Sequence, residues 1–112
     1  MMIEVVIRKY LSSVLSVPVY LERPEETPES FVLFEKTGSS RSNHILSSTF
    51  AFQSYANTMQ KTAELNEQVK DAVDGLLSQN EIHSVRLNSD YNYTDTTTKQ
   101  YRYQAVFDIG HY

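Results

Sequence analysis

A long amphipathic helix is the feature of this 112-residue chain that most restricts its fold. Residues 57–78 carry apolar side chains at helical spacing. The stripe comprises Leu65, Val69, Ala72 and Leu76. Such spacing puts the apolar side chains on one helix face, which must be buried against another layer. Asn57 is expected to cap this helix, with Gln60 at capping-box spacing. Gly75 is expected to permit close packing of the helix on a sheet.

A second helix opens the chain, and five extended segments supply a sheet. Residues 2–16 show helical spacing, and Pro18 ends the pattern because it disfavours helix at the preceding residue. Glu4 and Arg8 are spaced to pair on the exposed side of this helix. Strand patterns follow at residues 17–21, 31–37, 45–55, 82–93 and 99–109. The polar segments at residues 22–30, 38–43 and 94–99 are expected to form a loop, a turn and a hairpin tip.

The order of these elements is α-β-β-β-α-β-β, which predicts an α+β fold. We expect a two-layer sandwich, with a mostly antiparallel sheet of four to five strands and two helices on one face. The length predicts a single domain over residues 1–112. Alternating side chains of the last strand should share the face that the helices cover. These side chains are Tyr101, Tyr103, Ala105, Phe107 and Ile109.

Composition argues against several classes of function. The chain has no cysteine, so a disulfide scaffold, a thiolate metal site and a cysteine nucleophile are excluded. Ten lysines and arginines against fourteen acidic residues leave a net charge of −4. Specific nucleic-acid binding through phosphate neutralisation is therefore not expected. The apolar runs are too short for a signal peptide or a membrane span, so we expect a soluble protein.

No pattern of catalytic or ligand-binding residues stands out. The three glycines are isolated, which does not support a phosphate-binding loop, and no GxSxG motif occurs. Glu81 and His83 could share a strand face, but a surface histidine explains them better than a zinc site. Paired carboxylates are best explained as solvated charges on a loop and a helix. These pairs are Glu25–Glu26 and Asp71–Asp74. We expect no enzymatic activity, no cofactor and no metal.

Tyrosine is concentrated in the last quarter of the chain. The residues are Tyr91, Tyr93, Tyr101, Tyr103 and Tyr112. Cross-strand aromatic pairing would explain them within the sheet, and enrichment at a protein interface is the alternative. Stacking on single-stranded nucleic acid is less well supported, because Lys99 and Arg102 are the only cations in this region and several aspartates offset them.

Three stretches, together with the opening helix, resemble a known group of proteins. The stretches are VPVYLERPEETPESFVLFEKTG (residues 17–38), SSTFAFQSYANTMQKTAELNEQVKDAV (residues 47–73) and LNSDYNYTDTTTKQYRYQAVFDI (residues 87–109). They resemble the small tail-completion or minor structural proteins of long-tailed (siphovirus-type) phages and prophages of Gram-positive bacteria. Those proteins are similar in fold to the lambda tail terminator family. The most characteristic piece is residues 98–107.

The resemblance implies a structural role in a virion tail or neck. It implies a homohexameric ring that caps the tail tube and joins it to the head connector or stopper protein, after assembly in the host bacterial cytoplasm. An acidic segment would suit the DNA channel of such a ring, because it repels phosphate. The residues expected to face the channel are Glu22, Glu25, Glu26 and Glu29. Tyrosine offers a large contact area at modest entropy cost and suits an interface. The expected interface residues are Tyr91, Tyr93, Asp95, Thr98 and Lys99.

Other interpretations of the same sequence stay open. A head-completion or neck protein of the same virion class would share the size, the acidity and the ring symmetry. A small protein-binding module unrelated to phages would also fit the composition. Both polar segments could also be solvated loops without a partner. The hypothesis for these two segments is that one faces the channel and the other reaches a neighbouring subunit or the tube.

Overall fold

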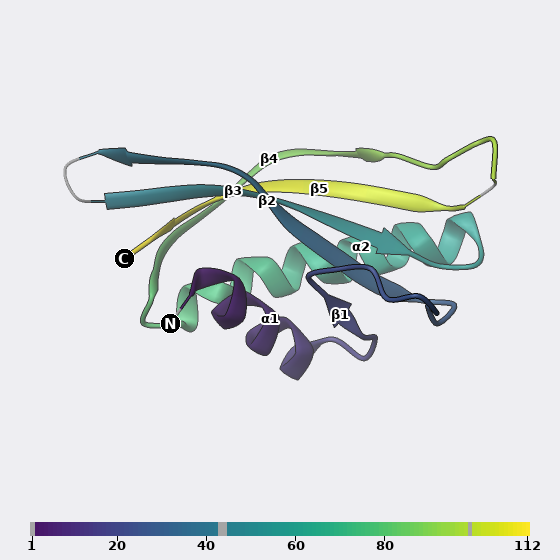
Figure 1. Cartoon of the computed structure of the whole chain (residues 1–112), viewed down its shortest axis with the longest axis horizontal. Coiled ribbons are helices and arrows are strands. Elements are labelled where there is room, and N and C mark those ends of the chain that lie inside the picture. The colour runs from purple at the N-terminus through teal and green to yellow at the C-terminus, as the bar shows by residue number, and fades with distance from the viewer. Residues whose placement is uncertain (1, 43–44, 99) are drawn as a thin grey trace.

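The computed structural model describes residues 2–42, 45–98 and 100–112. In these residues two α-helices and a five-stranded sheet form the predicted α+β fold. Both helices lie on the same side of the sheet (Figure 1). The elements are α1 (Ile3–Val14), β1 (Val19–Tyr20), β2 (Phe31–Ser42), β3 (Ile45–Tyr55), α2 (Met59–Asp74), the 3₁₀ turn η1 (Gly75–Ser78), β4 (Ile82–Asn92) and β5 (Arg102–His111).

The sheet has the strand order β1-β2-β3-β5-β4. All neighbouring strands are antiparallel except the short pair β1 and β2, which is parallel. The predicted element order and the mostly antiparallel sheet are therefore confirmed. The final strand, β5, lies between β3 and β4, so residues from the middle and the end of the chain become neighbours on the sheet.

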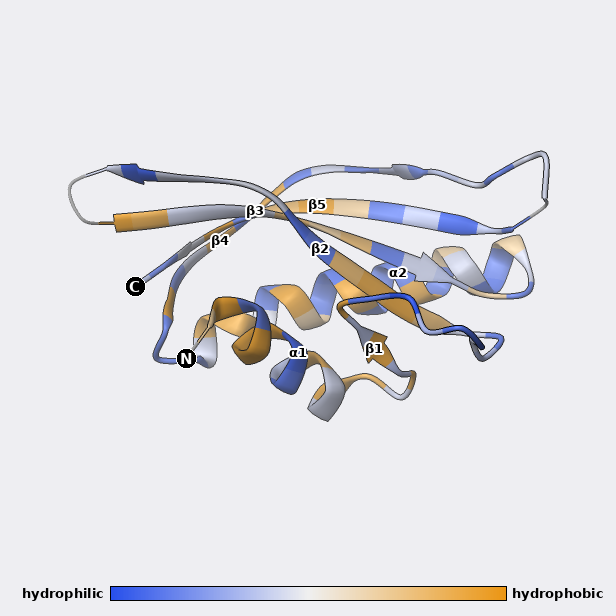
Figure 2. Cartoon of the chain, viewed as in Figure 1, coloured by the Kyte–Doolittle hydropathy of each residue, from blue (hydrophilic) through white to orange (hydrophobic). Residues whose placement is uncertain are grey.

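The core lies between the sheet and the two helices. Phe52 is at its centre, where its ring stacks on Phe34 at 5.4 Å and meets Phe107 edge-on at 5.9 Å between ring centroids. The helices add fully buried side chains, namely Ile7, Leu11, Val69 and Val73. Figure 2 shows apolar residues on the facing surfaces of the two layers. Among the side chains predicted for this face, those of Ala105, Phe107 and Ile109 are buried, whereas Tyr103 is half-buried.

The predicted turn at residues 38–43 is wrong for the residues that the structure describes. Residues 38–42 continue β2 and pair with β3, as in the register of Ser39 with Ser48. A register shift between Lys36 and Gly38 marks a bulge in this strand. The turn composition is outweighed because residues 38–42 pair with β3, which satisfies backbone groups at alternate positions. Residue 43 lies outside the described residues.

The predicted cap of the long helix is displaced by one residue. Thr58 is the N-cap, and its side chain accepts a hydrogen bond from the Lys61 backbone N–H at 3.1 Å. Asn57 instead donates its amide to the Glu29 carboxylate at 3.3 Å. The helix begins at Met59, so Thr58 holds the N-cap position and its hydroxyl oxygen satisfies one of the free N–H groups of the first turn.

Gly75 packs against a helix rather than the sheet, in contrast to the prediction. It follows the last residue of α2, and a Cβ at this position would lie 2.5 Å from the hydroxyl oxygen of Tyr10 on α1. The absence of a side chain here lets the Tyr10 ring reach the end of α2.

The predicted pair between Glu4 and Arg8 does not form. Glu4 lies 3.6 Å from the Lys36 ammonium on β2, and the Arg8 Nε donates to the Val19 carbonyl at 3.4 Å. Both charged side chains therefore bind α1 to the sheet, Glu4 through an ion pair with β2 and Arg8 through a hydrogen bond to β1.

Candidate functional site

Three connecting segments meet at one end of the molecule. They are the glutamate loop (residues 21–30), the connection between β3 and α2, and the β4–β5 hairpin tip (residues 93–101), all on the right in Figure 1. The Arg23 Nη1 donates to the Gln100 Oε1 at 3.4 Å, which links the glutamate loop to the hairpin tip. The bond between Asn57 and Glu29 links the same loop to the start of α2. We call this the loop end of the molecule. The acidic and tyrosine-rich segments predicted from the sequence are neighbours there.

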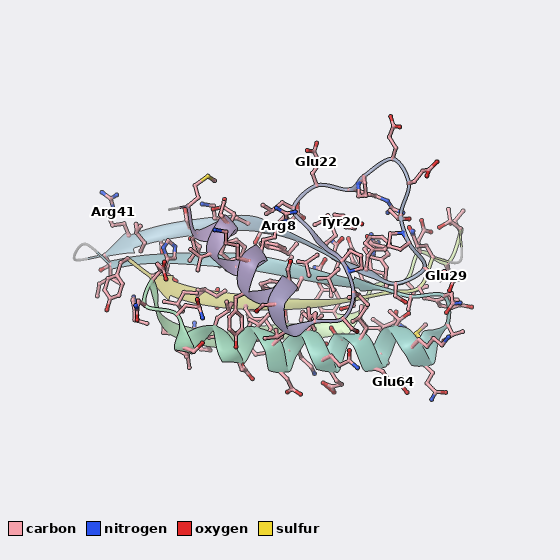
Figure 3. The ribbon with its side chains drawn as sticks, turned by 90° about the horizontal axis from the view of Figure 1, so that it is seen from below. Arg8, Tyr20, Glu22, Glu29, Arg41 and Glu64 are labelled. Carbon is pink, nitrogen blue, oxygen red and sulfur yellow. The ribbon has the colours of Figure 1, made fainter. Side chains whose placement is uncertain are left out.

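The four glutamates expected to face a channel all lie on the surface of the glutamate loop. Glu22, Glu25, Glu26 and Glu29 are all exposed. Figure 3 shows Glu22 pointing outwards, away from the sheet. Arg23 is the only cation in this loop. The loop therefore presents a negative surface at the loop end.

The residues expected at an interface lie along the β4–β5 hairpin. Tyr91 and Tyr93 are 42% and 47% exposed, and their rings meet edge-to-face at 5.8 Å. The Asp95 Oδ1 accepts hydrogen bonds from the Thr97 backbone N–H at 2.9 Å and the Thr98 backbone N–H at 3.4 Å. These bonds, with that from Thr97 first, hold the pKa of Asp95 below its usual range. Thr98 is exposed, and Lys99 lies outside the described residues.

A row of aromatic and cationic side chains crosses the helix-free face of the sheet at the loop end. Its members come from neighbouring strands and the start of the hairpin tip, and we call this row the ladder: Phe31, Tyr55, Arg102 and Tyr93. The rings of Phe31 and Tyr55 stack at 4.5 Å between centroids. The Arg102 Cζ lies 5.8 Å from the Tyr55 ring centroid and 4.3 Å from that of Tyr93. Cation–π contacts of this kind hold the guanidinium in place.

Hydrogen bonds fix the same guanidinium further. The Arg102 Nη1 donates to the Tyr55 hydroxyl at 3.2 Å, and its Nε donates to the Tyr93 carbonyl at 3.0 Å. The Tyr55 hydroxyl in turn donates to the Gln53 Oε1 at 3.0 Å. Tyr55 is only 3% exposed, so its hydroxyl needs these partners. Arg102 is thus held in one orientation by two rings and two hydrogen bonds.

A hollow of about 340 Å³ opens beside the ladder, and two arginines contribute to it. Its lining includes Arg23, Arg102 and Glu35, with apolar surface from Leu21 and Leu33. The Arg23 Cζ lies 5.3 Å from the Tyr55 ring centroid, on the same ring that Arg102 approaches. Among the described residues, neither arginine forms an ion pair. We call this feature the two-arginine hollow.

Sequence reasoning missed the two-arginine hollow. Phe31 and Tyr55 belong to predicted strands, and Arg23 lies in the predicted loop at residues 22–30. No local signal could bring them together, because Arg23 and Arg102 are far apart in the chain. The fold of the glutamate loop brings Arg23 to the Tyr55 ring, and the β3–β5 register brings Arg102 to it. Alternation does put Arg102 on the face opposite the core, which is the one clue the sequence offered.

The remaining polar groups do not suggest a catalytic or metal centre. No cluster of three His, Cys, Asp or Glu side chains that could hold a metal ion occurs in residues 2–42, 45–98 and 100–112. His111 is buried, and its Nε2 lies 2.8 Å from the Ser48 hydroxyl. His83 lies beside the Tyr112 ring at 5.2 Å between centroids. A second hollow of about 430 Å³ lies between the end of α1 and the middle of α2.

Comparison with known sequences gives no relative for this chain. No protein-family model and no curated protein matches it. In the part of the chain that the structure describes, no helix is both long and apolar enough to cross a membrane. The features that bear on function are therefore the surfaces of the loop end and the resemblance in the sequence.

Proposed function

We propose that this chain is a tail-completion protein of a long-tailed phage or prophage. In this role it is a structural subunit of a homohexameric ring that caps the tail tube and joins it to the head connector. The observation that carries the proposal is the meeting of an exposed acidic loop and an exposed tyrosine hairpin at one end of a single sheet. The resemblance of residues 17–38, 47–73 and 87–109 to proteins of this group supports it.

The proposal gives each segment of the loop end a separate task. The glutamate loop faces the central channel, where its negative charge repels DNA phosphates and keeps the DNA mobile. Tyr91 and Tyr93 dock on the tail tube or on the adjacent subunit, where their large rings give contact area at low entropy cost. Since both segments lie at the loop end, this end belongs at the channel rim, where the ring meets the tube.

Electron microscopy of mature tails tests the location. The protein is labelled with a small gold-binding tag, and negatively stained tails of the virus that carries its gene are imaged. We expect the label only at the head-proximal end of each tail. Label along the whole tube, or none at that end, would contradict the proposal.

Binding to separated virion parts distinguishes the proposed role from the neck role. Purified protein is mixed with tail tubes that lack a cap and, in parallel, with DNA-filled heads that lack tails. A tail-completion protein sediments with the tubes, whereas a neck protein sediments with the heads. Binding to neither would favour a protein-binding module outside the virion.

A further inference from the structure

We propose that the two-arginine hollow binds an acidic side chain from a segment of a partner protein, with its carboxylate held by Arg23 and Arg102. This site lies on the helix-free face of the sheet and does not depend on the tail role proposed above. A failure of one proposal therefore leaves the other standing.

The first argument is that the guanidinium of Arg102 is prepositioned. Stacking on Tyr93 and hydrogen bonds to Tyr55 and Tyr93 restrict its orientation before any ligand arrives. An arginine has five N–H donors in a fixed fork, and these bonds use only its Nε and Nη1. The remaining N–H donors can form bidentate hydrogen bonds with a carboxylate. Little side-chain entropy is lost on binding, because the guanidinium is already held in place.

The second argument is an unmatched positive charge. Arg23 approaches the same Tyr55 ring and lines the same hollow, and its one hydrogen bond among the described residues goes to the neutral amide of Gln100. Glu35 also lines the hollow, but it pairs with neither arginine in the described part of the chain. Among the side chains that line it, the hollow holds two cations and one anion, so a single added carboxylate balances the charge of its lining. Asp95 lies outside this lining; the hydrogen bond from Thr97 is the first cause of its lowered pKa, and the charge of Arg102 is a minor one.

The third argument concerns the class of ligand. Glu35 inside the hollow and four exposed glutamates on the adjoining loop repel a polyanion such as a nucleic-acid strand. The exposed Leu21 and the Leu33 side chain provide apolar walls beside the arginines. A short peptide with one acidic side chain next to an apolar one fits this site, because its carboxylate can pair with the arginines and its apolar side chain can pack against the two leucines.

A titration followed by nuclear magnetic resonance tests the site. Labelled protein receives the capped peptide acetyl-Leu-Glu-Leu-amide, and the Nε–Hε signals of the arginines are monitored. We expect saturable shifts of the Arg23 and Arg102 signals. The matched peptide with glutamine should bind at least about tenfold more weakly, because it lacks the charge-assisted hydrogen bonds.

Variants assign the binding to the two arginines. Arg23→Gln removes a charge from an exposed loop and leaves the hydrogen bonds of Arg102 to Tyr55 and Tyr93 in place, and it should weaken peptide binding about tenfold. Arg102→Lys keeps the charge but loses the planar fork, and it should also weaken binding. Arg41→Gln is the control, because Arg41 is exposed at the opposite end of the sheet (Figure 3) and its loss should leave the affinity unchanged.

The contrary outcomes are equally definite. Equal affinity for the glutamate and glutamine peptides would overturn the proposal, as would unchanged binding by Arg23→Gln. Inorganic phosphate or a short oligothymidine competing at lower concentration than the glutamate peptide would also overturn it, since the hollow would then select phosphate. Should Arg102→Lys fail to fold, as judged by its melting curve, Arg23→Gln alone decides.

Discussion

Asp108 on β5 is the most heavily hydrogen-bonded carboxylate on the helix-free face. It accepts bonds from the Thr49 hydroxyl at 2.7 Å, the Asn88 amide at 3.1 Å and the Arg86 guanidinium at 3.4 Å. These bonds, with that from Thr49 first, hold the pKa of Asp108 below its usual range. The ionised carboxylate thus joins β3, β4 and β5 across the sheet.

This depressed pKa predicts a loss of stability in acid. The contribution of Asp108 is complete at pH values above the unfolded pKa of about 4, and it is lost as the pH falls through the lower pKa of the folded state. Urea unfolding from neutral pH down to acid should show a decline in the free energy of unfolding that is shallower in Asp108→Asn. Asp95→Asn is a useful comparison, because the pKa of Asp95 is also lowered but its carboxylate lies in an exposed tip. Parallel curves for wild type and Asp108→Asn would contradict the assignment.

Thr58, and not its neighbour Asn57, caps the N-terminus of α2. Thr58→Ala should lower the free energy of unfolding by about 1 kcal/mol, because it removes the acceptor for the Lys61 backbone N–H. Asn57→Ala is the matched control and should change it by less than about 0.5 kcal/mol, since its bond to Glu29 is exposed. Chemical denaturation of both variants measures the difference. A larger cost for Asn57→Ala would restore the cap expected from the sequence.

At the scale of elements, α2 is the part of the fold on which the core depends most. Its stripe is buried against β3 and β5, and Val69 is fully buried at its centre. Glu64 and Gln68 occupy the opposite, exposed side of the same helix. Lys70 joins the helix to β4 through an ion pair with Asp90 at 2.6 Å. The helix is thus anchored by both its apolar stripe and its flank.

A charge placed on this stripe should unfold the protein, whereas the same charge on the exposed side should not. Val69→Asp would bury an unpaired carboxylate and should cost at least about 4 kcal/mol. Gln68→Asp puts the same group one residue away in solvent and should cost less than about 1 kcal/mol. Thermal melting followed by circular dichroism compares the two. A cooperative melt of Val69→Asp within a few degrees of wild type would show that the stripe is not core.

At the scale of the whole molecule, the arrangement of the hairpins governs what a partner can reach. The molecule is elongated, with principal extents of 44 × 25 × 24 Å. The β2–β3 hairpin points to one end, and the β4–β5 hairpin points to the other (Figure 1). The glutamate loop joins the second of these ends, so charge and exposed tyrosine are concentrated there.

If the tail role holds, the hairpin tip can be disabled without unfolding the protein. Tyr93→Ala combined with Asp95→Ala removes an exposed ring and a half-buried carboxylate, and neither belongs to the core. We expect a melting temperature within a few degrees of wild type and a loss of tail capping, measured as the yield of completed tails. Glu64→Gln on the outer side of α2 (Figure 3) is the control and should cap tails normally. Wild-type yield from the double variant would show that the hairpin is not the docking surface.

Local periodicity explains why much of the fold is determined by the sequence alone. The helical spacing around Val69 and the strand alternation over residues 45–55 each depend on neighbours within one element, and both elements form as predicted. The element order then restricts the architecture to a few layered arrangements, and the predicted α+β sandwich is one of them.

Tertiary structure decided the features that depend on residues distant in the chain. The extension of β2 through residues 38–42 required β3 as a partner, and the Asn57 side chain found its partner, Glu29, on the distant glutamate loop. The register of β3 with β5 put Tyr55 beside Arg102, and the fold of the glutamate loop brought Arg23 to the same ring. Strand pairing and loop closure are non-local contacts, so no pattern within a single element encodes them. The two-arginine hollow is therefore a product of the packed sheet.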